Sequence, residues 1–252
     1  MWLEPHELRI DVAPELADAL DPAGQERWPV TGRLESARLS RDFAIGGVTL
    51  PAGTTVELNE ESWLDPRRPD RVRGAVVSGP TTVPLVGGHR VEAGARLGFS
   101  EDGRCSSVRH AFREPTRLGR FVVHPTETLQ WNAAGELLGF ALGEALQVGG
   151  VTIPTGSRFS TWDLVSVREW YVNLGGAVPL PQLTVGPRDT LRVSRDLSRV
   201  VAVGTRNDVV VDGVTLEGDI VQFQVDDELR IDLAWCQRAG LVRRPAIMLK
   251  PS

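Results

Sequence analysis

The feature that most constrains this chain is an internal repetition. The stretch AIGGVTLPAGTTVEL (residues 44–58) returns as QVGGVTIPTGSRFST (residues 147–161) and, more loosely, as VVDGVTLEGDIVQF (residues 210–223). The first two stretches align without a gap at a constant shift of 103 residues. Repetition at a fixed period is typical of stacked supersecondary units, so it restricts the fold more than any single motif does.

Turn-forming dipeptides indicate further copies between these stretches. Gly-Gly, Asp-Gly and similar pairs are the strongest local signal for a two-residue β-hairpin turn. Such pairs recur about every thirty residues, which predicts six copies of one unit. A longer first interval coincides with DPRRPDR (residues 65–71), which we expect to be a surface-loop insertion. The six pairs occupy positions 46–47, 87–88, 119–120, 149–150, 181–182 and 212–213.

Each copy has the pattern of about four short strands. Val48 and Leu50 lie on one side of the chain with Thr49 on the other, as a half-buried strand requires. PAG or PTG then forms a second turn, and another alternating strand follows. We therefore predict an all-β protein, a repetitive antiparallel β-meander in an elongated twisted sheet or solenoid. A closed barrel or a small six-bladed propeller is the alternative.

The sequence around the repeats predicts a cap at each end. Residues 1–31 are expected to form an N-terminal cap with a short helix within APELADAL (residues 13–20). Residues 32–230 form the predicted repeat domain, and residues 231–252 the C-terminal cap, with a helix within LAWCQRAGL (residues 233–241). Caps are expected because an uncovered sheet edge invites pairing with other chains.

The segment GRLESARLSRDFAIGGVTLPAGTTVEL (residues 32–58) resembles a tandem β-hairpin repeat of bacterial proteins. That repeat is loosely related to the MORN and YwqK types, and the resemblance covers roughly residues 32–229. It implies a scaffold and specifies no catalytic residue. MORN-type repeats are associated with partner or membrane-surface binding and YwqK-type proteins with toxin neutralisation, so the resemblance implies an immunity or antitoxin-like role.

Composition excludes several classes of protein. The 252 residues carry a net charge of −5, which argues against nucleic-acid binding because such proteins usually present a basic surface. No segment approaches the ~20 apolar residues that a transmembrane helix needs. The first twenty residues contain acids and prolines where a signal peptide has a basic start and an apolar run, so we expect a cytoplasmic protein.

Motifs for catalysis, cofactors or metals are missing from the sequence. No lysine follows a glycine-rich turn as in a P-loop, and neither GxSxG nor HExxH occurs. The four histidines have no metal-ligand spacing, so we predict no metal and no cofactor. Cys105 and Cys236 are expected to be buried reduced thiols, although a thiol nucleophile at Cys236 is an alternative. The acids of LNEES (residues 58–62) and VDDEL (residues 225–229) suit solvated turns.

One segment concentrates aromatic residues where the repeat pattern degrades. In TWDLVSVREWYVNL (residues 161–174), Trp170 alternates onto one face of the predicted strand and Tyr171 onto the other. Large side chains on both faces indicate either packing between two layers or a surface for a partner. Aromatic residues beside an arginine are enriched at protein-binding hot spots. The candidate partner-binding residues are Trp162, Arg168, Trp170 and Tyr171.

These observations leave two functional hypotheses. The first is a non-catalytic β-repeat scaffold that mediates protein–protein interaction or self-assembly, with an immunity or antitoxin-like role as one version. The second is a hydrolase whose site is built from the hairpin tips of a closed ring. Missing catalytic signatures and the aromatic segment favour the scaffold.

Overall fold

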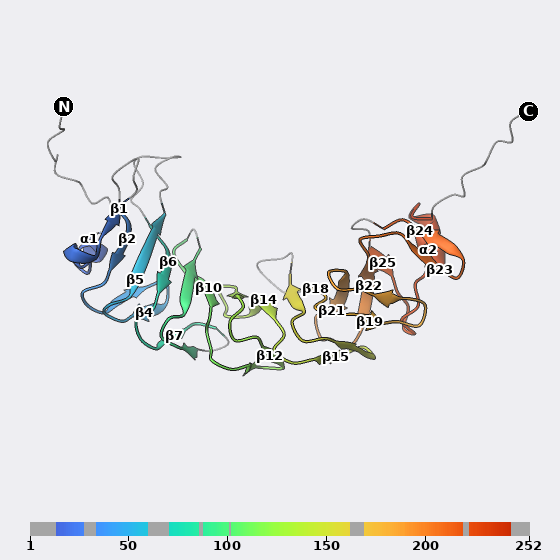
Figure 1. The fold of residues 1–252 in the computed structure, drawn as a ribbon, viewed down its shortest axis with the longest axis horizontal. Helices are drawn as coiled ribbons and strands as arrows, with labels where there is room; N and C mark the ends of the chain where they lie inside the picture. Colours follow the sequence, from blue (N-terminus) through green and yellow to red (C-terminus); the bar gives the residue numbers. More distant parts are fainter. Residues whose placement is uncertain are drawn as a thin grey trace, which may run out of the picture. The chain divides into compact units, whose positions relative to one another are not determined.

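The computed structural model describes residues 14–27, 34–59, 71–85, 88–100, 102–161, 169–218 and 222–242. The chain divides into two compact bodies, which are described separately. The N-terminal body comprises residues 1–119 and 125–137, and the C-terminal body comprises residues 120–124 and 138–252. Figure 1 shows the elements of both bodies in chain order.

The main sheet of the N-terminal body is antiparallel throughout its described strands. Helix α1 (Pro14–Ala17) and the short 3-10 helix η1 (Pro22–Gly24) precede it. In hydrogen-bonded order, its strands are β1 (Glu26–Arg27), β2 (Leu34–Arg38), β5 (Thr55–Asn59), β6 (Arg71–Val76), β9 (Arg96–Phe99), β10 (Cys105–Arg109) and β13 (Leu129–Trp131). The remaining strands are β3 (Phe43–Ile45) paired with β4 (Val48–Leu50), β7 (Thr81–Val83) paired with β8 (His89–Val91), and β11 (Thr116–Leu118).

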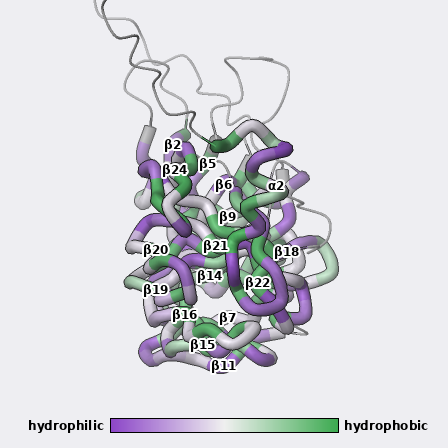
Figure 2. Tube along the Cα trace, turned by 90° about the vertical axis from the view of Figure 1, so that its right-hand side faces the viewer, coloured by the Kyte–Doolittle hydropathy of each residue, from purple (hydrophilic) through white to green (hydrophobic). Residues whose placement is uncertain are grey.

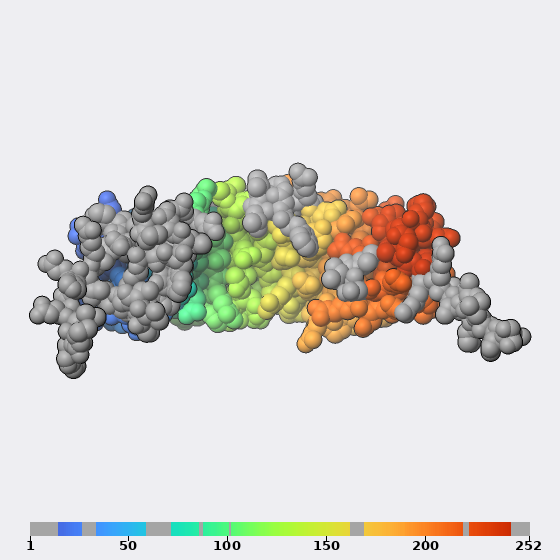
Figure 3. All heavy atoms as spheres, turned by 90° about the horizontal axis from the view of Figure 1, so that it is seen from above, coloured from blue at the N-terminus to red at the C-terminus, as the bar shows by residue number. Residues whose placement is uncertain are grey.

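The C-terminal body has the same arrangement and ends in helix α2 (Leu233–Arg238). The strands of its main sheet are β14 (Leu137–Ala141), β17 (Arg158–Ser160), β18 (Glu169–Asn173), β21 (Thr190–Ser194), β22 (Val200–Gly204) and β25 (Gln222–Gln224). Its other strands are β12 (Phe121–Val123), β15 (Leu146–Val148) paired with β16 (Val151–Ile153), β19 (Val178–Pro179) paired with β20 (Thr184–Val185), and β23 (Val209–Val211) paired with β24 (Val214–Leu216). Figure 3 shows this body from green to red in chain order.

The strand order confirms the predicted all-β antiparallel meander and adds one feature to it. In each copy of the pattern, two strands join the main sheet and the next two form a separate two-stranded hairpin. The four-stranded propeller blade offered as an alternative is therefore wrong, because a blade keeps its four strands in one sheet. Among the described strands β1 pairs only with β2 and β25 only with β22, so the sheet does not close into a barrel.

The predicted two-residue hairpin turns form where both central residues can adopt positive φ. Gly46 and Gly47 connect β3 to β4 with φ of +59° and +83°. Asp212 and Gly213 connect β23 to β24 with φ of +49° and +80°. A type I′ turn needs this backbone conformation, which glycine adopts freely and aspartate tolerates. These turns are confirmed.

The pair Gly87-Gly88 does not form the predicted two-residue turn. The last paired residues of that hairpin are Val83 and His89, so residues 84–88 connect the strands, and residues 86–87 lie outside the described part of the chain. Pro84 explains the early end of pairing because proline lacks a backbone N–H and has a fixed φ. The loop of the predicted insertion, up to residue 70, also lies outside the described residues.

The core is formed by the apolar side chains that alternate along the strands, and helix α2 covers its C-terminal end. Figure 2 shows apolar segments along the strands and polar segments at the turns. The predicted C-terminal helix is confirmed as α2, whose first turn is capped by the Asp232 carboxylate accepting a hydrogen bond from the Trp235 N–H at 2.8 Å. Beneath it lies a cluster of buried residues: Val211, Leu216, Phe223, Ile231 and Cys236.

Candidate functional site

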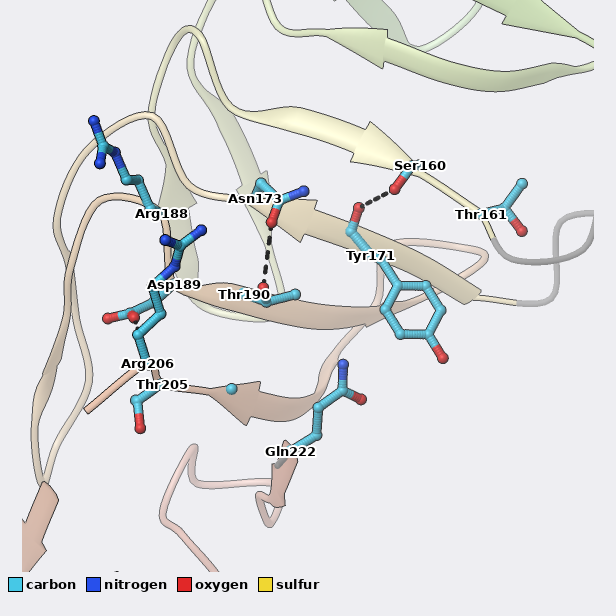
Figure 4. Close-up of a pocket in the computed structure, with 11 residues that line it drawn as sticks. Ser160, Thr161, Tyr171, Asn173, Arg188, Asp189, Thr190, Thr205, Arg206 and Gln222 are labelled. Atoms are coloured by element: carbon cyan, nitrogen blue, oxygen red, sulfur yellow. Dashed lines mark hydrogen bonds between the residues drawn. The ribbon is translucent and has the colours of Figure 1, made fainter. Parts of the chain in front are cut away.

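An open cavity of about 500 Å³ lies on the main sheet of the C-terminal body. It extends across β17, β18, β21, β22 and β25 and the turn that precedes β21 (Figure 4). Its size falls within the range of pockets that bind small ligands. The lining residues are Ser160, Thr161, Tyr171, Asn173, Arg188, Asp189, Thr190, Gly204, Thr205, Arg206 and Gln222.

Strand alternation explains why polar residue types line this cavity. In β18, Trp170 and Val172 are buried in the core, whereas Tyr171 is half-buried and Asn173 is exposed on the opposite face. Successive side chains of a strand point to opposite faces, so an apolar inner face requires a polar outer one here. Thr190 of β21 pairs with Asn173 across the sheet, which brings polar residues of neighbouring strands together.

Hydrogen bonds fix the floor of the cavity. Thr190 Oγ1 donates to Asn173 Oδ1 at 3.3 Å. Beside them, Arg192 Nε lies 2.9 Å from Glu169 Oε2, and Arg192 Nη1 donates to Gln222 Oε1 at 3.2 Å. Each amide oxygen therefore accepts one hydrogen bond, and the amide groups of Asn173 and Gln222 have N–H donors to offer to a ligand.

One end of the cavity is formed by a turn with an unusual backbone. Arg188 has a φ of +75°, and the Asp189 N–H donates to the Gly186 carbonyl at 3.2 Å to close the turn. The corresponding turns in other copies place a glycine at this position, Gly53 and Gly156 among them. A non-glycine residue at positive φ is uncommon and strained. The fifth copy therefore retains an arginine at the cavity where the pattern favours glycine.

The carboxylate of Asp189 is engaged by the backbone. Its Oδ2 accepts a hydrogen bond from the Gly186 N–H at 2.9 Å, and its Oδ1 accepts one from the Arg206 N–H at 3.0 Å. Asp189 thus joins its own turn to the segment after β22 and places Arg206 beside Arg188. In Figure 4, Arg188 and Arg206 lie at one end of the cavity and Tyr171 at the other.

The two predicted partner-binding residues that the structure describes, Trp170 and Tyr171, lie on opposite faces of β18. Tyr171 lines the cavity, as an accessible partner residue must. Trp170 is only 3% exposed and belongs to the core, so it offers no surface to a partner. Trp162 and Arg168 lie outside the described residues.

Trp170 completes an aromatic cluster beneath the sheet. Its ring lies 5.5 Å from that of Phe140 and 5.8 Å from that of Phe159, both in edge-to-face geometry, and Phe121 lies 5.6 Å away. Edge-to-face and offset arrangements are the favourable geometries for aromatic pairs. Core packing, one of the two interpretations that the sequence left open for this segment, therefore accounts for Trp170.

The thiols have environments that suppress nucleophilic chemistry. Burial raises the pKa of Cys105 to about 12, against a weaker lowering by its contact with the Ser107 carbonyl. Burial, followed by the nearby charge of Asp232, also raises the pKa of Cys236. Both thiols are free and buried, as predicted. A thiolate is the reactive form, so the alternative of a nucleophile at Cys236 loses its support.

Of the remaining candidate acids, Asp226 serves its own turn, whereas residues 60–62 lie outside the described part of the chain. Asp226 Oδ1 accepts hydrogen bonds from the backbone N–H groups of Glu228 and Arg230, each at 2.9 Å, which assigns that acid to its own turn. Within the described ranges, no group of three or more histidine, cysteine or acidic side chains is placed to hold a metal ion. None of the described helices has both the length and the apolar character to cross a membrane.

Sequence reasoning missed the cavity residues other than Tyr171. Asn173, Thr190 and Gln222 come from three strands, and no local pattern distinguishes them from other outward-facing residues. Arg188 did carry a signal, because GPRD (residues 186–189) has arginine where PAG and PTG have glycine.

Comparison of the chain with protein-family models, with curated proteins and with solved structures finds no match. The function is therefore argued from the geometry of the cavity.

Proposed function

We propose that this chain is a non-catalytic β-scaffold that binds a partner protein through the cavity face of its C-terminal body. The observation that carries the proposal is the open cavity in which Tyr171 lies at one end and Arg188 and Arg206 at the other. Tyrosine and arginine are, with tryptophan, the residue types enriched at the energetic centres of protein interfaces. Strand β18 holds Tyr171, and the hydrogen bonds of Asp189 hold together the turn of Arg188 and the segment of Arg206.

The resemblance to MORN and YwqK-type repeats supports the same proposal. It implies a scaffold that binds partners, and an immunity or antitoxin-like role is its most specific version. The hydrolase alternative has less support, because the acid Asp226 is engaged by backbone N–H groups and Cys236 is a buried thiol with a raised pKa.

Site-specific photo-crosslinking in a lysate of the native host tests the proposal. Tyr171 is replaced by p-benzoylphenylalanine, which keeps an aromatic group in the cavity. The matched control places the same group at Val210, which is 64% exposed on hairpin β23–β24 of the same body. We expect one protein to be crosslinked from position 171 and not from position 210.

The crosslinked protein must then be purified and bound to the unmodified full chain. Formation of a stoichiometric complex that Tyr171→Ala weakens about tenfold or more would match the loss expected for a hot-spot residue. Identical crosslinks from positions 171 and 210, or none from either, would overturn the proposal. A crosslink to a second copy of the chain would assign the cavity to self-assembly, the other version of the scaffold hypothesis.

A further inference from the structure

Hydrogen-bond donors are prominent among the groups that line the cavity. Asn173 Oδ1 accepts one hydrogen bond from Thr190 and Gln222 Oε1 accepts one from Arg192, whereas both amides still offer N–H donors. Arginine has only donors, and both Arg188 and Arg206 are exposed at the cavity. A ligand that satisfies these groups must be rich in acceptors.

One end of the cavity has an excess of positive charge, because two arginines, Arg188 and Arg206, lie there with the single carboxylate of Asp189. Among the described residues, no carboxylate forms an ion pair with the guanidinium of Arg188 or Arg206. Of the acids nearest along the chain, Asp189 directs its two oxygens to the backbone N–H groups of Gly186 and Arg206, and Asp208 Oδ1 accepts a hydrogen bond from the Gly218 N–H. Arg192, by contrast, is already paired with Glu169. The two free guanidiniums therefore make this end attractive to an anion.

The backbone at Arg188 strengthens the assignment. A glycine would adopt this φ of +75° without strain, and glycines do have positive φ at the equivalent positions 53 and 156. The turn holds this conformation through the hydrogen bond from the Asp189 N–H to the Gly186 carbonyl. The copies that have a glycine at this position present no side chain there, whereas here an arginine side chain lines the cavity.

We propose that the cavity binds an extended acidic segment of the partner protein, with carboxylates on Arg188 and Arg206 and an apolar or aromatic side chain against Tyr171. This inference rests on the proposed function and names the chemistry of its partner. The backbone carbonyls of an extended peptide supply the acceptors that Asn173 and Gln222 require.

An array of random dodecapeptides probed with the labelled full chain tests this inference. We expect bound peptides to be enriched in aspartate and glutamate with an aromatic or apolar residue nearby. A soluble fluorescein-labelled peptide taken from that set should bind about tenfold more weakly to Arg188→Gly or to Arg206→Gln, and about a hundredfold more weakly to the double variant. Binding should also weaken between low and high salt, because the charges are exposed.

Two controls keep the outcome interpretable. Arg188→Gly relieves a strained backbone, so we expect this variant to have a higher melting temperature than the unchanged chain. A loss of peptide binding by a variant that is more stable cannot be ascribed to misfolding. Arg117→Gln removes an exposed arginine of β11 in the N-terminal body and should leave binding unchanged.

Several results would overturn the inference. One is a set of bound peptides that is not enriched in aspartate and glutamate. Another is that replacing Asp and Glu of a bound peptide by Asn and Gln leaves its affinity unchanged. A third is full competition by succinate at the concentration of the peptide, which would assign the site to a small dicarboxylate. If the Tyr171 crosslink still identifies a partner in these cases, the proposed function stands and only the acidic chemistry fails.

Discussion

Ser157 Oγ accepts a hydrogen bond from the Gly175 N–H at 3.0 Å, and Ser157 is fully buried. The corresponding residue of the first copy, Thr54, is equally buried and accepts one from the Ser78 N–H at 3.2 Å. Both residues follow the second turn of their copy, at the same shift of 103 residues as the opening repetition. A side-chain oxygen at this position therefore joins each of these turns to the strand-to-hairpin connection that follows it.

Removing this oxygen should destabilise the C-terminal body. We expect Ser157→Ala to lower the free energy of unfolding by about 1–3 kcal/mol, because the Gly175 N–H would lose its partner in a buried site. Urea denaturation of the full chain measures the change. Ser157→Thr is the matched control, since threonine occupies the equivalent position 54, and its loss should be smaller. Equal losses for both variants would contradict the role assigned to the hydroxyl.

Arg188 provides the opposite test, in which a substitution should stabilise. We expect Arg188→Gly to raise the free energy of unfolding by about 0.5–1 kcal/mol, the strain of positive φ less the extra entropy of glycine in the unfolded chain. Arg188→Ala also removes the guanidinium but keeps the strain. The glycine variant should therefore melt at a higher temperature than the alanine variant, and the reverse order would show that the turn is unstrained.

The aromatic cluster should contribute more to stability than to binding. Phe140→Ala is expected to cost about 3–5 kcal/mol, because it leaves a cavity among three other aromatic rings. Tyr171→Ala, on the opposite face of the sheet, should cost clearly less since Tyr171 is only half-buried. Denaturation midpoints of the two variants check the order. Comparable losses would mean that Tyr171 belongs to the core.

Trp170 belongs to the same cluster, and this determines which variants can report on binding. Trp170→Ala would weaken partner binding by unfolding the sheet, because Trp170 is 3% exposed. A partner that binds at the cavity should therefore respond to Tyr171→Ala while the fold, monitored by circular dichroism, stays intact.

The thiol of Cys105 should make stability depend on alkaline pH. Its pKa is raised from 9.0 to about 12 by burial, so the folded chain holds the thiol proton more tightly than the unfolded chain does. This contribution to stability is fully present below pH 9 and is lost as the pH rises through about 12. Between pH 9 and 11, the unfolding free energy of Cys105→Ala should therefore fall less steeply than that of the unchanged chain. Parallel slopes would rule out a raised pKa at this position.

Much of the fold follows from local rules that are visible in the sequence. Gly-Gly and Asp-Gly at the hairpin turns predict positive φ, and alternating residues such as Trp170 and Val172 predict the buried face of a strand. These features depend on a few neighbouring residues, so periodicity was sufficient to predict them. The sequence could not divide the four strands of each copy between two sheets, because the same alternation suits both arrangements.

The cavity could not be predicted from the sequence, because it is formed by residues that are far apart in the chain. Tyr171 could be predicted to face away from Trp170, but which of them faces the core depends on the layer against which β18 packs. The cavity arises because strand register brings Asn173, Thr190 and Gln222 together across the sheet. Sequence by itself thus determined the strands, their turns and their alternation. Only the tertiary structure decided which outward residues meet, because register and packing are set by the whole sheet rather than by any one strand.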